Sequence, residues 1–101
     1  MQVTQRIADD AATLALAGRF DFNAHREFRD GYEALLKKPG VQSLEIDMGN
    51  VDYLDSSALG MLLMLKDRAS ASNVKIRITR TTGTVRQILE IANFDKLFSI
   101  T

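Results

Sequence analysis

The sequence contains no cysteine, a single proline and no long hydrophobic run. The lack of cysteine excludes a disulfide framework and thiolate chemistry, and it agrees with a cytoplasmic location. The longest apolar run, residues 58–65, is far shorter than the roughly 20 residues that a membrane-spanning helix needs. Because no apolar segment follows the first residues, we expect no signal peptide. We therefore expect a cytoplasmic protein that does not enter a membrane.

An excess of charge of one sign is also absent. The chain has 13 basic and 13 acidic residues, and they form no long block, so neither nucleic acid nor an anionic membrane is an expected partner. His25, the only histidine, has no histidine or cysteine nearby, which predicts a surface residue and no metal site. The dispersed glycines form no phosphate-binding loop, and no serine lies in a Gly-x-Ser-x-Gly context. We expect neither a cofactor nor an enzyme.

Four segments alternate apolar and polar side chains, which predicts strands with one buried face: residues 2–7, 13–17, 43–48 and 74–79. The first two form a hairpin across Asp9 and Asp10. If the last two are neighbours, Glu45 and Asp47 lie opposite Lys75 and Arg77.

Three segments show helical periodicity. The first has Asn23 as its cap and stops at Pro39 and Gly40, the second covers about 57–71, and the third begins near Thr82. The apolar stripe of the first helix consists of Ala24, Phe28, Tyr32 and Leu35. A short helical turn and an edge strand ending at Ile100 close the chain. One α/β domain over residues 1–101 is predicted, with a mixed four- to five-stranded sheet and helices packed on one face.

The most informative stretch is Asp55-Ser56-Ser57, where a strand and its loop lead into an apolar helix. The first turn of a helix has unpaired N–H groups and a positive dipole end, which favour a hydroxyl, a carboxylate or a phosphate. A serine here is a helix cap, a phosphate carrier, or both in turn. Ser57 is expected to cap the helix or to support the site, and a secondary phosphoacceptor is the remaining alternative. Asp55 either caps the helix or positions a neighbouring hydroxyl.

The helix after this stretch is more apolar than one buried face requires. Its core-facing stripe consists of Ala58, Met61, Leu62, Leu65 and Ala69. Leu59, Leu63 and Met64 remain, and they are candidate partner-binding residues. Burial by neighbouring helices is the alternative explanation, and it applies best to Leu59.

The segment 54–60, Leu-Asp-Ser-Ser-Ala-Leu-Gly, resembles the STAS-domain anti-sigma factor antagonists, the anti-anti-sigma factors of bacterial partner-switching systems. The resemblance covers essentially the whole chain, including Gly-Arg-Phe-Asp at 18–21 and the closing segment 94–98. Ala58 stands where the family often has glycine, a change that a first helical turn tolerates. In this family the phosphorylated hydroxyl directly follows the aspartate, which implies Ser56. Asp21 matches the family's early aspartate, and it either approaches the switch serine or simply forms a turn.

The resemblance implies a switch in which the unphosphorylated protein binds an anti-sigma factor and releases the sigma factor. A serine kinase of the histidine-kinase-like ATPase type would phosphorylate Ser56, and a PP2C-type phosphatase would reverse this. Similar proteins of Gram-negative bacteria influence the flagellar anti-sigma factor or a diguanylate cyclase, which implies an output to motility or biofilm. An accessory STAS subunit of a lipid-trafficking ABC ATPase is the alternative. Nucleotide binding by the domain is a third possible function, but the sequence shows no phosphate-binding loop to support it.

Overall fold

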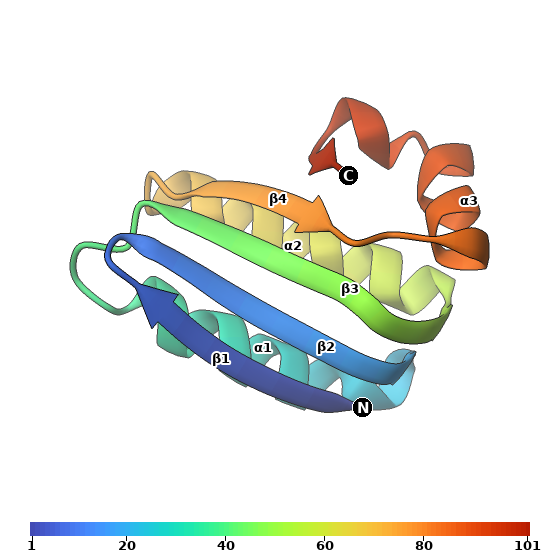
Figure 1. The fold of residues 1–101 in the computed structure, drawn as a ribbon, viewed down its shortest axis with the longest axis horizontal. Helices are drawn as coiled ribbons and strands as arrows, with labels where there is room; N and C mark the ends of the chain where they lie inside the picture. The colour runs from blue at the N-terminus through green and yellow to red at the C-terminus, as the bar shows by residue number, and fades with distance from the viewer.

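The computed structural model describes residues 1–101 and contains five strands, three α-helices and two short 3-10 turns (Figure 1). The strands are β1 Gln2–Ala8, β2 Ala11–Phe20, β3 Ser43–Leu54, β4 Lys75–Thr79 and β5 Ser99–Ile100. The helices are α1 His25–Leu36, α2 Ser56–Ala71 and α3 Gly83–Ile91, and the 3-10 turns are η1 Phe22–Ala24 and η2 Phe94–Lys96. The predicted order of elements is confirmed.

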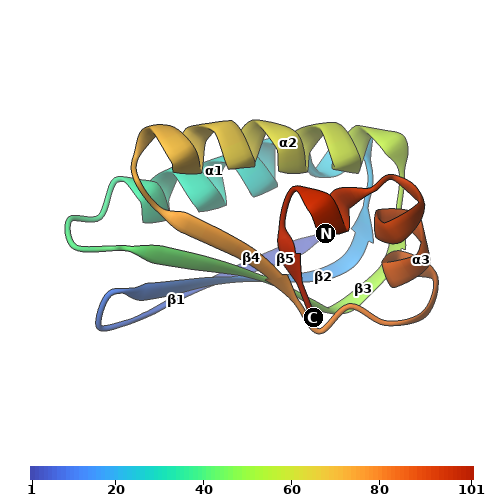
Figure 2. The same cartoon turned by 90° about the horizontal axis from the view of Figure 1, so that it is seen from above.

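The five strands form one sheet in the order β1-β2-β3-β4-β5. β1 and β2 are antiparallel, whereas every other neighbouring pair is parallel, so the sheet is mixed as predicted. Figure 2 shows α1 and α2 side by side on one face of the sheet, with the other face open. α3 lies at the end of the sheet where β3 ends and α2 begins (Figures 1 and 2).

The core lies between the sheet and this helical layer and contains 24 buried apolar residues. Both predicted helical stripes are part of it: the four apolar positions of the first helical segment and the five of α2 are all buried. Gly31 allows α1 to pack closely on the hairpin, because a Cβ atom there would lie 2.9 Å from Cγ1 of Val3 and 3.1 Å from Cδ1 of Leu14. Helical periodicity therefore identified the buried faces correctly.

Two local predictions are wrong. Asn23 does not cap the first helix: Asp21 caps the 3-10 turn η1, its carboxylate accepting the Asn23 N–H at 3.0 Å, and α1 follows Ala24 without a side-chain cap. The second predicted strand, placed at residues 13–17, is also too short, because β2 spans Ala11–Phe20. Gly18 takes a φ of +99° beside a shift in the β2–β3 register. Glycine adopts this conformation without a steric penalty, so the strand bends instead of ending.

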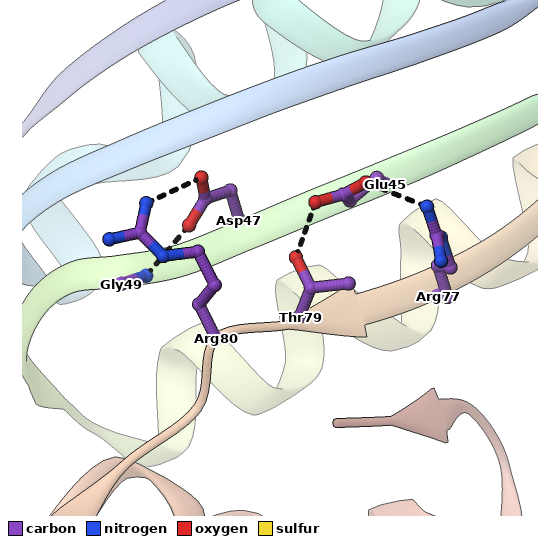
Figure 3. A network of polar contacts seen from close by, with 6 residues as sticks. All are labelled: Glu45, Asp47, Gly49, Arg77, Thr79 and Arg80. Carbon is purple, nitrogen blue, oxygen red and sulfur yellow. Dashed lines mark hydrogen bonds and ion pairs between the residues drawn. The ribbon is translucent and has the colours of Figure 1, made fainter.

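Polar contacts stabilise the open face of the sheet (Figure 3). Glu45 accepts hydrogen bonds from Arg77 at 2.8 Å and from the Thr79 hydroxyl at 2.7 Å. The Asp47 carboxylate accepts a hydrogen bond from the Gly49 N–H at 2.9 Å and another from Arg80 at 3.1 Å. The predicted pairing of Glu45 with Arg77 is confirmed. Asp47 lies opposite Thr79 and pairs with Arg80, which no pattern in the sequence indicated.

Candidate functional site

The site is built where β2 and β3 end side by side. Phe20 pairs with Leu54 in the parallel register, and the Asp55 N–H donates to the Phe20 carbonyl at 3.3 Å. Asp21 and Asp55 are the next residues of their chain segments, so two carboxylates follow adjacent strand ends. Asp21 and Asp55 therefore begin two neighbouring loops, and Asp21 forms a local turn by accepting the Asn23 N–H.

Asp55, and not a serine, is the N-cap of α2. Its Oδ1 accepts the Ala58 N–H at 2.9 Å while its backbone remains extended. Ser56 and Ser57 are then the first two residues of the helix. Because the carboxylate already satisfies an amide of the first turn, the capping role expected for Ser57 is not needed.

The two serines differ in exposure. Ser56 is exposed and Ser57 is half-buried. The Ser56 hydroxyl therefore stands at the positive end of the α2 dipole and is open to an approaching enzyme, whereas Ser57 is less accessible.

Charge at this end of the sheet is mixed. The Arg19 guanidinium lies 3.5 Å from the Asp21 carboxylate and 4.0 Å from the centroid of the Tyr53 ring. Arg19 and Tyr53 are paired residues of β2 and β3. This arrangement holds Asp21 beside the strand ends and gives a surface with one cation and two carboxylates.

The apolar flank of α2 is only partly as expected. Leu63 and Met64 are 39% and 52% exposed, so neighbouring helices do not cover them. Leu59 is half-buried and packs against the core, which supports the alternative explanation for that residue. Met64 borders a groove between α1 and α2, together with His25, whose predicted surface position is confirmed. Leu63 lies about 10 Å along the helix from Ser56.

Sequence patterns did not identify Phe22 as a surface residue. It is 72% exposed in η1, directly after Asp21, although it is a large aromatic residue. Its neighbours Phe20 and Ala24 are buried, and no pattern in the sequence separates Phe22 from them. An exposed aromatic residue beside a candidate switch site suits protein binding.

Tyr32 lies in the groove between α1 and α2. Burial raises the pKa of the Tyr32 phenol, and the negative charge of Glu33 raises it further, whereas Arg68 and Arg29 lower it. Glu33 and Arg68 form an ion pair of 2.7 Å between the two helices.

No group of three or more His, Cys, Asp or Glu side chains is placed to hold a metal ion. None of the helices has the length and apolar character that a membrane span requires.

Comparison with protein families identifies the domain. A family model described as "Mlab, STAS domain" matches residues 3–99. A STAS-domain containing protein of Pseudomonas aeruginosa (strain UCBPP-PA14) is 48% identical over 88 residues, which cover 87% of this chain and 85% of that protein. The chain belongs to the STAS-domain family.

Solved structures show the same fold. The anti-sigma factor antagonist SpoIIAA in its unphosphorylated form superposes with a TM-score of 0.82 at 15% identity, over 99% of this chain and 88% of that chain. The phosphorylated form of the Bacillus protein gives 0.74 at 14% identity, over 99% and 91%. A sulfate transporter family protein from Wolinella succinogenes gives 0.78 at 10% identity, over 91% and 74%. The fold is therefore that of a STAS domain, which occurs in regulators and in transporters.

Proposed function

We propose that this protein is an anti-sigma factor antagonist whose binding is switched off by phosphorylation of Ser56. The observation that carries the proposal is the division of roles between neighbouring residues. Asp55 caps α2, and the exposed Ser56 hydroxyl is left at the helix tip. The similarity in fold to SpoIIAA, solved in unphosphorylated and phosphorylated forms, supports this role.

In the unphosphorylated state, the tip of α2 and its apolar flank bind the anti-sigma factor, which then releases its sigma factor. Phe22 and Met64 provide exposed apolar surface, and Leu63 extends it along the helix. A serine kinase of the histidine-kinase-like ATPase type transfers a phosphoryl group to the Ser56 oxygen. A PP2C-type phosphatase hydrolyses the ester. We place these steps in the cytoplasm.

Phosphorylation acts on the interface and leaves the fold intact. The phosphate adds a charge of about −1.5 to −2, which the positive end of the α2 dipole tolerates while the site faces water. In a complex, the same charge would lose water and would lie near the carboxylates of Asp55 and Asp21. Burying an uncompensated charge in this way costs several kcal/mol, which is enough to abolish a regulatory complex.

Affinity purification from native cells tests the proposal with three variants. We expect an anti-sigma factor to co-purify with the wild type and with Ser56→Ala, and to be lost with Ser56→Asp. Gln42→Asp is the matched control, because it adds the same charge to an exposed residue at the opposite end of β3. Equal recovery with Ser56→Asp and Gln42→Asp would refute a charge-controlled switch.

The alternative is an accessory subunit of a transport ATPase, such as a lipid-trafficking ABC system. The fold that the chain shares with a sulfate transporter family protein supports this alternative. In that case an ATPase subunit would co-purify with the wild type, and the Ser56→Asp variant would still retain it.

We further propose an output to motility or biofilm, through the flagellar anti-sigma factor or a diguanylate cyclase, which rests on the family resemblance alone. Swimming and biofilm assays in strains carrying Ser56→Ala and Ser56→Asp test this output. Opposite changes in the two strains would support it, and identical behaviour would contradict it.

A further inference from the structure

A second concave surface lies near the other end of α2 from Ser56. It is a cleft of about 670 Å³ between the second half of α2, the start of β4 and the C-terminal segment. Lys66 and Ser70 line it from α2, about 15 to 20 Å along the helix from Ser56. Its volume is within the range of small-molecule sites. The cleft is therefore separate from the proposed switch site.

The cleft exists because the last strand is short. β5 contains only Ser99 and Ile100, which pair with Arg77 and Ile78 of β4. The first residues of β4 pair with β3 on one side and have no strand on the other, so the cleft curves around this free edge. Figure 1 shows the short C-terminal strand beside the arrowhead end of β4, with no strand on that side of its start.

The lining combines apolar side chains with cations. Val74, Ile76 and Leu97 are its apolar residues, and Lys66, Lys75 and Arg77 are its charged residues. Hydroxyl groups of three serines complete it, and no carboxylate lines it: Ser43, Ser70 and Ser99. Leu97 is 45% exposed, so an apolar ligand would remove a large hydrophobic surface from water.

Two of the three cations have no ion-pair partner within the chain. Arg77 forms an ion pair of 2.8 Å with Glu45, but neither Lys66 nor Lys75 takes part in any of the six ion pairs of the structure. Three cations and one nearby carboxylate leave a local charge of about +2, which attracts anions. Ser70 supplies a hydroxyl on the same helix as Lys66, one turn further along.

We propose that this cleft binds an amphiphilic anion, with a phosphate or carboxylate head between Lys66 and Lys75 and an apolar body against Ile76 and Leu97. The head would receive charge-assisted hydrogen bonds, and the apolar wall would distinguish such a ligand from an inorganic anion. The proposal does not depend on phosphorylation of Ser56.

Titration of the ¹⁵N-labelled full chain with octyl phosphate, followed by NMR, tests the site. We expect amide shifts centred on Lys66, Ser70, Lys75 and Leu97, and at least tenfold weaker binding of inorganic phosphate. The double variant Lys66→Gln/Lys75→Gln should weaken octyl phosphate binding at least tenfold. Lys37→Gln/Lys38→Gln, which removes the same charge from exposed residues after α1, should leave it unchanged.

A second variant keeps the test decisive if the lysine variant is poorly folded. Leu97→Ser retains every cation, so it should weaken octyl phosphate and leave inorganic phosphate unchanged. Scattered shifts, or equal loss in both lysine double variants, would overturn the proposal. Stronger competition by a short polyglutamate peptide would also overturn it in favour of an acidic protein partner.

Sedimentation with vesicles of phosphatidic acid in phosphatidylcholine identifies the source of the ligand. Lysine-dependent sedimentation would assign a lipid head group, whereas octyl phosphate binding without sedimentation would assign a free amphiphile. Both results uphold the site.

Discussion

Asp55 determines the geometry of the proposed switch site because it relieves both neighbouring serines of the capping role. Its carboxylate accepts the Ala58 N–H at 2.9 Å, and its own N–H reaches the Phe20 carbonyl at 3.3 Å. One residue thus fixes the start of α2 and joins it to the end of β2. The adjacent Ser56 keeps a free and exposed position.

Replacement of Asp55 by alanine should destabilise the domain by about 1 kcal/mol, because loss of an N-cap side chain has this cost. For a domain of this size, the melting temperature should fall by about 4 to 8 °C. Thermal unfolding followed by circular dichroism measures the change. Asp52→Ala is the control, since Asp52 is exposed and makes no ion pair in the structure. Equal melting temperatures for the two variants would contradict the capping role.

At the scale of elements, α2 serves two surfaces at once. Its buried stripe holds the helix on the sheet, and its remaining flank is left partly in water, with Met64 at 52% exposure. Methionine adapts well to protein partners, since its side chain is flexible and polarisable. The flank and the Ser56 tip therefore form one continuous binding surface in the proposed function.

The variant Met64→Glu should lower the affinity for the partner at least tenfold, because it places a charge in an apolar contact. Its unfolding free energy should change by no more than about 0.5 kcal/mol, as is usual for exposed positions. Ile7→Glu is a matched control, because Ile7 is 44% exposed on β1. Calorimetric binding measurements and thermal unfolding decide the outcome. An equal loss of affinity in both variants would exclude a specific role for the α2 flank.

At the scale of the whole molecule, the contact between α1 and α2 should make the stability of the fold vary with pH in the alkaline range. The pKa of the Tyr32 phenol is raised by burial and by Glu33. Because the pKa is higher in the folded state than in the unfolded state, the protonated phenol stabilises the fold. This stabilisation is fully present below about pH 10 and is lost as the pH rises through the folded-state pKa.

Ultraviolet titration of Tyr53→Phe isolates this group, because the chain has two tyrosines. We expect Tyr32 to ionise above the ordinary phenol pKa of about 10, with native circular dichroism retained until ionisation begins. Ionisation at or below that value in a native protein would show that the phenol is not buried as described.

The whole fold was largely predictable because its signals are periodic. The alternation of 43–48 and the stripe of α2 each depend on local spacing alone. The cap of α2 was not predictable, since Asp55, Ser56 and Ser57 are all good capping residues and only the backbone geometry selects one. The position of Asp21 and Asp55 at neighbouring strand ends depends on the β2–β3 register, which is a long-range property that local patterns do not contain.

The cleft beside β4 illustrates the same limit of local patterns. Leu97 and Lys66 are 31 positions apart in the chain, and they line one cavity only because β5 stops after two residues. Likewise, the contact of Arg80 with Asp47 depends on a left-handed backbone at Arg80, with a φ of 58°. A non-glycine residue rarely takes this conformation, so no local sequence pattern predicts this contact.

The most direct test of the central claim is intact-protein mass measurement with phosphosite mapping, on protein purified from its native cells. We predict one phosphate on Ser56 in a fraction of the molecules, and its loss in a Ser56→Ala strain. An unphosphorylated protein under every growth condition, or a phosphate that persists in the Ser56→Ala strain, would contradict the switch and favour a constitutive accessory subunit.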